Sequence, residues 1–460
     1  MGNKVRKNIS LYRHLIALAL PIALQNMISY SISLTDNLMV GRLGEVAISG
    51  VYLCNQIQII LQMLVVGLGT AQLVLAAQYW GRKDKESVKD IISISVKFAA
   101  VCAVIFWIAI FFFPRQILGM YTNSPEVLTE AVKYIRIVCF SYIFFTISNV
   151  LLVSMRCVGT VKIGLYISIM SLAVNVLLNW ILIFGKFGAP AMGIRGSATA
   201  TLITRILEFG IIVYYVLVVD RKLMLKLRDL LRMNFILMKD YIRYGIPVLM
   251  GDILWGINLT VQGAIIGRLG TSSISAVSIA NTLYSVISVG VYGTASASAV
   301  IVGKAVGEGD LNNIKLISQK FQKVFLYVGM ATGIFLYLIK DIVLGFYSIS
   351  ADTLSIVNTL LIVLSFTVIG TAYQMSTLTG IVRAGGAVHF VLINDLIFIW
   401  GIVIPLSYIM AFVLHTPTWI VFLCLKCDQV LKCIVAVIKV NRYDWIKKLT
   451  KDFTPKESTV

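Results

Sequence analysis

The apolar stretches of this sequence contain few ionisable side chains, and Asp36 is the first that could do chemistry. A charged side chain at the centre of a bilayer costs about 2.5 to 3.5 kcal/mol on insertion scales, so its presence needs a reason. A carboxyl that meets water on alternate sides of a membrane can load a proton on one side and release it on the other. We therefore take Asp36 as a candidate ion-coupling residue. The structural alternative is a helix-end carboxylate in the membrane interface.

Two amides could serve as partners of this carboxyl. Asn175 and Asn179 are four residues apart and therefore share one face of a helix. The functional hypothesis is a polar network around Asp36. The alternative is that these amides only form hydrogen bonds between neighbouring helices.

Two further acidic residues have aromatic neighbours along the chain. Asp252 lies close to Trp255, and Asp395 lies close to Trp400. A carboxylate flanked by aromatic rings suits an organic cation, because charge pairing is reinforced by cation–π attraction of about 0.5 to 2 kcal/mol. We interpret Asp252, Trp255 and Asp395 as a second acidic site or a substrate contact. A buried polar contact without a role in transport is the alternative.

Asp428 and Lys432 form another charged pair, at i, i+4 spacing near the end of the last apolar stretch. This spacing places the two side chains on one helix face. We interpret them as a pair that reaches toward the membrane surface.

Pro21 lies in the same apolar stretch as Asp36 and precedes it by about four helical turns, and Pro247 precedes Asp252 by five residues in its own stretch. Proline removes one backbone hydrogen bond from a helix and can bend it. The hypothesis is a conformational hinge at each proline, and the alternative is a static kink.

Other chemistries find no support in the sequence. Gly303-Lys304-Ala305-Val306-Gly307 is not a phosphate-binding loop of the GxxxxGK[ST] type, and the three histidines lack a metal-ligand spacing. No paired acids and no nucleophile with a base have a workable spacing for an enzyme. We expect no cofactor and no metal, and an ion gradient as the source of energy.

The composition indicates that lipid surrounds these residues. Of 460 residues 58% are hydrophobic and 13% charged, whereas soluble domains have roughly 45 to 50% and about 25%. A helix needs about 20 apolar residues to cross a bilayer, so the chain can form a dozen spans. The expected spans are Leu15–Leu38, Ile48–Ala77, Ile91–Phe113, Val132–Met155, Ile163–Phe184, Ile194–Val219, Tyr241–Ile266, Ile274–Val302, Ile317–Ile339, Leu354–Ile381, Val388–Leu414 and Trp419–Val440.

The basic residues predict the orientation. The formal net charge is +19, but the lysines and arginines gather in alternate loops, in the central linker and after the last span. This distribution is an orientation signal rather than a nucleic-acid-binding surface. We expect a multi-pass protein of the plasma membrane with both termini in the cytoplasm.

An internal repeat organises the chain. Val40-Gly41-Arg42-Leu43-Gly44 recurs as Ile266-Gly267-Arg268-Leu269-Gly270, at a shift of 226 residues. At this shift Pro21 aligns with Pro247, and Gly81 aligns with Gly307. Farther along, Arg156 aligns with Arg383 at a shift of 227.

The repeat predicts an all-α membrane protein of twelve transmembrane helices in two six-helix lobes. Because six is an even number, the lobes share one orientation and are related by a pseudo-two-fold axis along the membrane normal. The predicted parts are an N-terminal lobe (1–219), a cytoplasmic linker (220–240), a C-terminal lobe (241–440) and a cytoplasmic tail (441–460). Asp36 aligns with the neutral Gln262, so we expect the ion-responsive site in the N-terminal lobe.

Several motifs together resemble the multidrug and toxic compound extrusion (MATE) family, of bacterial type. They occur in order along nearly the whole chain, and they are Ala19-Leu20-Pro21-Ile22, Asp36 with Gly41-Arg42-Leu43-Gly44, Ala77-Gln78-Tyr79-Trp80-Gly81, Asn175-Val176-Leu177-Leu178-Asn179, Leu182-Ile183-Phe184-Gly185 and Arg383-Ala384-Gly385-Gly386. The resemblance implies a two-lobe antiporter that exports cationic or amphipathic compounds in exchange for protons or sodium ions. It also implies that Asp36 couples the cation and that Asn175 and Asn179 lie beside it.

The chain departs from the family pattern at three places. Proton-coupled members often have aspartate where this chain has Asn179, and sodium-binding members have acids at positions held here by Trp255 and Ala372. Asp252, about one helical turn before Trp255, could stand in for the acid expected at that position. The resemblance therefore leaves the coupling ion open between H⁺ and Na⁺.

Three other functions compete with the antiporter. A flippase for lipid-linked sugars would share the two-lobe plan, but the sequence lacks the cluster of Arg and Lys within the spans that it would need. The sequence lacks the catalytic motifs that a membrane-embedded enzyme would need. A passive channel would not need a titratable residue in one lobe only. We expect a small-molecule substrate, the lipid bilayer as surroundings, and a monomer that functions alone.

Overall fold

The computed structural model describes residues 2–122, 124–345 and 350–451, and all secondary structure in these ranges is helical. Residues 452–460 of the predicted tail lie outside the described residues. The helices of the first half are α1 (Gly2–Gly41), α2 (Glu45–Gly81), α3 (Lys85–Phe112), α4 (Pro114–Gly119), α5 (Pro125–Val138), α6 (Ser141–Cys157), α7 (Lys162–Phe184), α8 (Ile194–Tyr214) and the π-helical turn η1 (Tyr215–Val219). The linker contains α9 (Leu227–Leu231).

The second half repeats this order with more interruptions. Its elements are α10 (Phe235–Gly267), α11 (Thr271–Ile287), α12 (Val289–Glu308), α13 (Leu311–Leu344), α14 (Ala351–Thr377), η2 (Leu378–Arg383), α15 (Val388–Asp395), η3 (Leu396–Val403), α16 (Ile404–Tyr408), η4 (Ile409–Val413), α17 (Thr418–Leu425) and α18 (Asp428–Arg442).

The helices agree with twelve membrane crossings. Within the described ranges ten helices are long and apolar enough to span a bilayer by themselves, and an eleventh span is α5 with α6, which meet at a bend of 51°. The twelfth is α17 with α18, broken into two short helices around Lys426. The predicted eighth span is α11 followed by α12, with a break at Ser288.

Residues at equivalent positions of the repeat cap helices in both halves. Asp84 caps α3 by accepting a hydrogen bond from the Ser87 backbone N–H (3.0 Å), and Asp310 caps α13 through the Asn313 N–H (3.1 Å). Such a cap satisfies one of the free N–H groups at a helix start. The sequence repeat is therefore also a repeat of helix boundaries.

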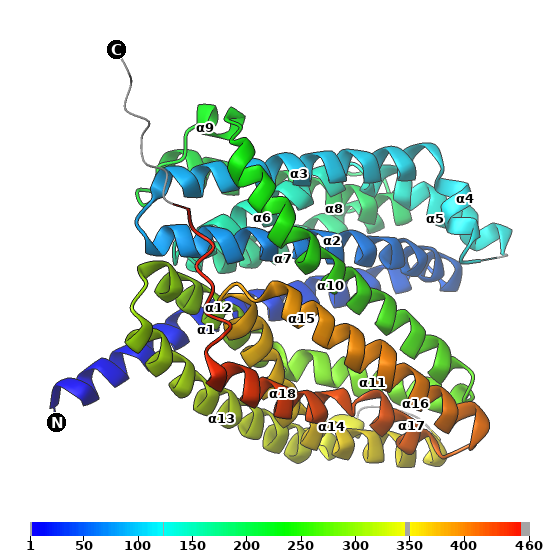
Figure 1. Ribbon diagram of the computed structural model, residues 1–460. Coiled ribbons are helices and arrows are strands. Elements are labelled where there is room, and N and C mark those ends of the chain that lie inside the picture. The colour runs from blue at the N-terminus through cyan, green and yellow to red at the C-terminus, as the bar shows by residue number, and fades with distance from the viewer. Residues whose placement is uncertain (1, 123, 346–349, 452–460) are drawn as a thin grey trace.

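The two halves form two lobes (Figure 1). The first helix of each half packs on the second span of the other half: α1 packs on α12, and α10 packs on α2. Gly293 of α12 leaves room for the backbone of Ala19 in α1, since a Cβ there would lie 2.7 Å from the Ala19 oxygen. The equivalent Gly67 of α2 leaves room for Leu249 of α10, where a Cβ would lie 2.7 Å from the Leu249 side chain. These paired contacts are what a pseudo-two-fold axis between the lobes requires.

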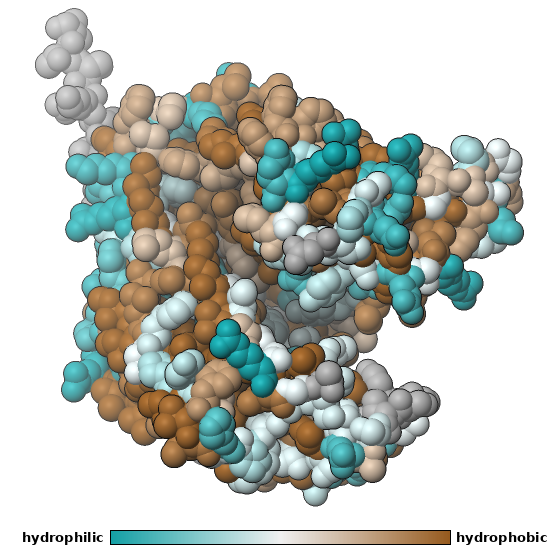
Figure 2. Space-filling model, turned by 90° about the vertical axis from the view of Figure 1, so that its right-hand side faces the viewer, coloured by the Kyte–Doolittle hydropathy of each residue, from teal (hydrophilic) through white to brown (hydrophobic). Residues whose placement is uncertain are grey.

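A second pair of contacts closes one end of the molecule. A Cβ on Gly81 of α2 would lie 2.1 Å from the backbone oxygen of Lys304 in α12, and a Cβ on Gly307 would lie 1.9 Å from that of Gln78. Gln78 and Lys304 are themselves repeat equivalents. The start of α1 and α9 also lie at this end, on the left of Figure 1, which we call the linker end. At the opposite end, which we call the open end, the surface is hollowed between the lobes (Figure 2).

Residues 443–451, which we call the strap, cross the linker end from one lobe to the other. Trp445 is fully buried in an apolar cluster dominated by the C-terminal lobe, and Leu449 is buried in a cluster dominated by the N-terminal lobe. Between them, Gln78 of α2 donates to the Lys447 carbonyl (3.3 Å) and accepts from the Leu449 N–H (2.9 Å). The strap therefore contacts both lobes where they meet.

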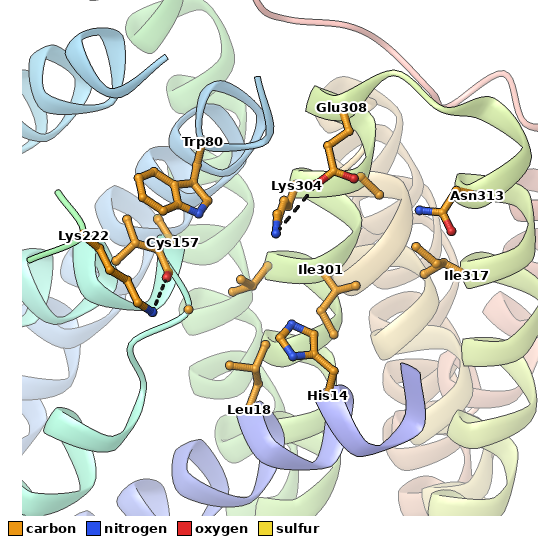
Figure 3. Close-up of a pocket in the computed structure, with 14 residues that line it drawn as sticks. His14, Leu18, Trp80, Cys157, Lys222, Ile301, Lys304, Glu308, Asn313 and Ile317 are labelled. Atoms are coloured by element: carbon orange, nitrogen blue, oxygen red, sulfur yellow. Dashed lines mark hydrogen bonds and ion pairs between the residues drawn. The ribbon is translucent and has the colours of Figure 1, made fainter. Parts of the chain in front are cut away.

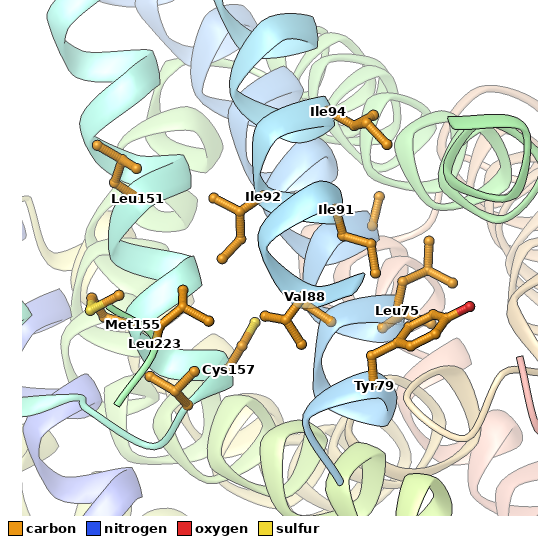
Figure 4. Packing of buried hydrophobic residues seen from close by; sticks show 14 of the residues in the cluster. Leu75, Tyr79, Val88, Ile91, Ile92, Ile94, Leu151, Met155, Cys157 and Leu223 are labelled. Carbon is orange, nitrogen blue, oxygen red and sulfur yellow. The ribbon is translucent and has the colours of Figure 1, made fainter. Parts of the chain in front are cut away.

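The linker enters the same N-terminal cluster. Leu223 is 1% exposed and lies beside Met155 and Cys157 of α6, with Val88 of α3 close by (Figure 4). The chain after the last helix of each half thus places a buried leucine in the N-terminal cluster, Leu223 from the linker and Leu449 from the strap. This packing fixes the linker end while the open end stays hollow.

Candidate functional site

The N-terminal lobe brings Asp36 together with both asparagines of the predicted network. Asp36 of α1 is half-buried, and Asn179 of α7 is fully buried. The Asn179 amide nitrogen donates to a carboxylate oxygen of Asp36 (2.5 Å) and to the amide oxygen of Asn175 (3.1 Å). The network of Asp36, Asn175 and Asn179 therefore exists, and it links two helices.

Further polar groups surround this network. Arg205 and Glu208 of α8 form an ion pair (2.7 Å), and their side chains are 22% and 10% exposed. Arg205 also lies over the Phe145 ring at 4.7 Å and within electrostatic reach of Asp36. Sequence reasoning did not identify this pair, although its i, i+3 spacing inside an apolar stretch could have revealed it.

The equivalent place in the C-terminal lobe carries no charge. Gln262 of α10 is buried and donates to the amide oxygen of Asn258 on the same helix (3.1 Å). The shift that aligns Arg156 with Arg383 puts Ile402 and Leu406 at the positions of Asn175 and Asn179. The carboxylate–amide network is thus a feature of one lobe.

The acidic residues of the C-terminal lobe are paired with cations instead. Asp252 of α10 lies 3.0 Å from a guanidinium nitrogen of Arg383, at the end of η2. Asp395, the last residue of α15, lies 2.8 Å from the ammonium of Lys432 in α18. The sequence analysis singled out both acids but predicted neither pairing, since the pairs join helices far apart in the chain.

Asp395 is the acid that meets the aromatic residues. A small cavity is lined by Trp255 of α10 together with Asp395 and Trp400. Asp252 is not among its lining residues and pairs with Arg383 instead. Of the two predicted carboxylate–aromatic groups, the structure therefore assembles the one around Asp395, with a tryptophan from each of two helices.

The interpretation of Asp428 and Lys432 as a pair at the membrane surface is wrong. The two side chains do pair (3.2 Å), but they are 4% and 2% exposed. Lys432 points into the lobe because it contacts two carboxylates there, Asp395 and Asp428. A buried cation needs such partners, and this need outweighs the reach of a long side chain toward water.

Comparison with known proteins identifies the family. The family model described as MatE matches residues 21–181 and 247–409. The chain belongs to the MATE family. The two matched segments begin at the repeat-equivalent Pro21 and Pro247, so the family pattern occurs once in each half.

Individual MATE relatives cover most of this chain. It is 23% identical over 407 residues to the "Probable multidrug resistance protein YoeA" of Bacillus subtilis, with 87% of each chain covered. It is 26% identical over 412 residues to the "Probable multidrug resistance protein NorM" of Agrobacterium fabrum, again with 87% of each covered. Among solved structures, a mutant of the Vibrio cholerae MATE transporter VcmN has a TM-score of 0.86 at 15% identity, covering 96% of this chain and 98% of that one.

Membership of the MATE family makes this chain a membrane transporter and not an enzyme. Its two predicted hinges lie where the MATE match begins in each half: Pro21 inside α1 and Pro247 inside α10, both within continuous helices. Whether these prolines act as hinges stays a prediction.

Proposed function

We propose that this transporter is a secondary antiporter of the plasma membrane that exports small organic, cationic or amphipathic compounds in exchange for H⁺ or Na⁺. The observation that carries the proposal is the network of Asp36 and Asn179, which joins α1 to α7 by a carboxylate–amide bond. In this proposal the linker end faces the cytoplasm, and a monomer suffices for transport.

The chemistry of this network suits a small cation. The Asp36 carboxylate and the amide oxygens of Asn175 and Asn179 are hard oxygen donors, which bind a proton or an alkali cation better than soft ligands do. The amide oxygen of Asn179 is buried, and no other described residue donates a hydrogen bond to it. An ion bound by Asp36 would compete with the Asn179 bond, so loading would loosen the contact between α1 and α7.

Alternating access then follows from the arrangement of the lobes. The α1 helix carries Asp36 near the open end and packs on α12 of the other lobe along its first half. A change in the contact of α1 with α7 is therefore transmitted to the interface between the lobes. Bending at Pro21 would supply the motion, and bending at Pro247 would supply its counterpart in α10.

The C-terminal lobe offers a contact for the exported compound. The Asp395 carboxylate is 33% exposed and lines, with Trp255 and Trp400, a cavity of about 10 Å³, which must widen before it can admit a compound. An anionic group between aromatic rings attracts organic cations. Several relatives carry the name multidrug resistance protein, which agrees with such substrates. Asp252 is our second candidate contact, reachable only if Arg383 moves.

The test uses inside-out vesicles and a fluorescent organic cation such as ethidium. A pH gradient and a sodium gradient are imposed separately on vesicles that contain wild type or Asp36→Asn. Uphill uptake driven by one gradient and lost in the variant is the expected result, and it would name the coupling ion. Uptake that persists in Asp36→Asn would refute the role of Asp36, and uptake under neither gradient would refute antiport of this cation.

A further inference from the structure

A cavity of about 380 Å³ lies between the two lobes at the linker end, outside the polar networks described above. Figure 3 shows that side chains from both lobes and from α1 point into it. Along α1, His14 in this cavity and Asp36 are 22 positions apart, or about 33 Å at the helical rise. The cavity is therefore separate from the site of ion coupling.

The polar lining of the cavity contains one acid, Glu308, the amide of Asn313 and three basic side chains, with one lysine from each side of the lobe interface. Lys222 belongs to the linker under the N-terminal lobe, and Lys304 belongs to α12 of the C-terminal lobe. His14 lies within electrostatic reach of both lysines. Two cations and a histidine around one cavity favour an anionic ligand.

Neither lysine is fully occupied by its neighbours. The Lys222 ammonium gives one of its three donors to the Val158 carbonyl (3.0 Å). The Lys304 ammonium lies 3.7 Å from Glu308, and both side chains remain nearly half exposed. Such an exposed pair contributes little to stability, so an incoming anion can replace it at little cost.

Apart from Asn313, the rest of the lining is largely apolar. Leu18 of α1, Trp80 of α2 and Ile301 of α12 face the cavity beside the lysines (Figure 3). A small inorganic anion would leave these side chains without a partner. A molecule with an anionic head and an apolar tail would satisfy both parts of the wall.

We propose that this cavity binds the phosphate group of an anionic amphiphile, which in a membrane is an anionic phospholipid. Lys222 and Lys304 contact the phosphate, and the apolar wall holds the first part of the tail. Basic pockets between transmembrane helices bind lipid head groups in this way.

Binding of this ligand would also depend on the conformation of the transporter. The backbone of Lys304 packs directly on Gly81 of the other lobe, so separation of the lobes at the linker end carries Lys304 away from Lys222. A phosphate that bridges the two lysines binds only the closed linker end. By linkage, such a ligand stabilises the form of the protein in which the linker end is closed.

The test measures emission of Trp80 in nanodiscs of phosphatidylcholine that contain phosphatidylglycerol with brominated acyl chains. Wild type is compared with Lys222→Gln/Lys304→Gln, and the part of the signal due to Trp80 is obtained by difference from Trp80→Phe. The control is Lys85→Gln/Lys448→Gln, which removes two exposed lysines from the same end without touching the cavity.

We expect brominated phosphatidylglycerol to quench Trp80 in wild type and in the control, with at least a tenfold weaker effect in the cavity variant. Brominated phosphatidylcholine should quench Trp80 less than phosphatidylglycerol does. Equal quenching in the cavity variant and the control, or no quenching of Trp80, would overturn the proposal.

A second arm distinguishes a lipid from a soluble phosphate. Inorganic phosphate and glycerol phosphate are added at millimolar concentration to the same nanodiscs. A lipid site predicts that neither relieves the quenching by phosphatidylglycerol. Relief that depends on Lys222 and Lys304 would assign the site to soluble phosphates and overturn the part of the proposal that concerns lipid.

Discussion

In the N-terminal half, Asp36 of α1 accepts a hydrogen bond from Asn179 of α7, whereas its counterpart Gln262 in α10 bonds Asn258 on its own helix. The first contact joins two helices by a hydrogen bond between a carboxylate and an amide. The second contact lies within α10. A carboxylate bonded to amides can exchange its partner for a proton or a sodium ion, and for this reason our proposal assigns the ion response to the N-terminal lobe.

A similar contrast separates two equivalent arginines. Arg156 of the first half donates to the Gln25 side chain (2.8 Å), and Arg383 of the second half pairs with the Asp252 carboxylate (3.0 Å). Both arginines reach back to the helix that begins their own half. At these equivalent positions the N-terminal lobe thus bonds its arginine to a neutral amide, while the C-terminal lobe pairs its arginine with a carboxylate.

The largest effect is expected from exchanging the groups at the two equivalent positions. Asp36→Gln copies the C-terminal lobe into the N-terminal one and should reduce gradient-driven uptake to background, because the amide cannot bind the coupling ion. Adding Gln262→Asp should not restore uptake, since Leu406 rather than an asparagine occupies the position equivalent to Asn179. Ethidium uptake by inside-out vesicles measures both. Restored uptake in the double variant would show that the lobes are interchangeable.

Next in size is the loss of the buried cation of the C-terminal lobe. Lys432→Met leaves Asp395 and Asp428 without their shared partner, which should destabilise the fold by about 3 to 5 kcal/mol. Asp395→Asn should cost less, because Lys432 keeps Asp428. All seven cysteines are free, so a thiol-reactive dye can follow thermal unfolding. Equal melting temperatures for the two variants would mean that the three charges do not act as one group.

A smaller difference is expected between the partners of the two arginines. Asp252→Leu leaves Arg383 unpaired and should cost about 3 kcal/mol, whereas Gln25→Leu removes one hydrogen bond to a charged group and should cost about 1.5 kcal/mol. The same thermal assay compares them. A larger loss for Gln25→Leu would reverse the contrast between the lobes.

Hydropathy and the repeat were sufficient to predict most of the fold, because a span needs only a long apolar run and a repeat needs only a constant shift. The network of Asp36 with Asn175 and Asn179 followed from helical spacing and from the family resemblance. In these cases the decisive information is local in the sequence or shared by both halves.

Contacts between helices that are distant in the chain could not be predicted from the sequence. The spacing of Asp428 and Lys432 predicted their pairing but not their depth, since depth depends on Asp395 of another helix. Trp445 and Leu449 lie in a charged segment that reads as a tail, yet they are buried because Gly385 and Gln78 provide a backbone contact and a hydrogen-bond partner. Only the packed lobes create these partners.

The smallest effect on stability is expected for two leucines of the N-terminal apolar cluster, one from the linker and one from the strap. Leu223 anchors the linker under its own lobe, while Leu449 anchors the strap that arrives from the other lobe. Replacing either by Ala should cost about 2 kcal/mol of packing. Leu223→Ala should therefore lower thermal stability only, whereas Leu449→Ala should also weaken the contact between the lobes and change turnover by a few-fold.

Hydrogen exchange distinguishes the two variants. The N–H groups of Lys447, Leu449 and Lys451 bond to Gly385, Gln78 and Tyr79, so they should be protected in wild type. Leu449→Ala should speed their exchange, while Leu223→Ala should leave it unchanged. Equal protection in both variants would mean that the strap follows the lobes passively. A selective loss would show that the strap helps to hold the linker end closed.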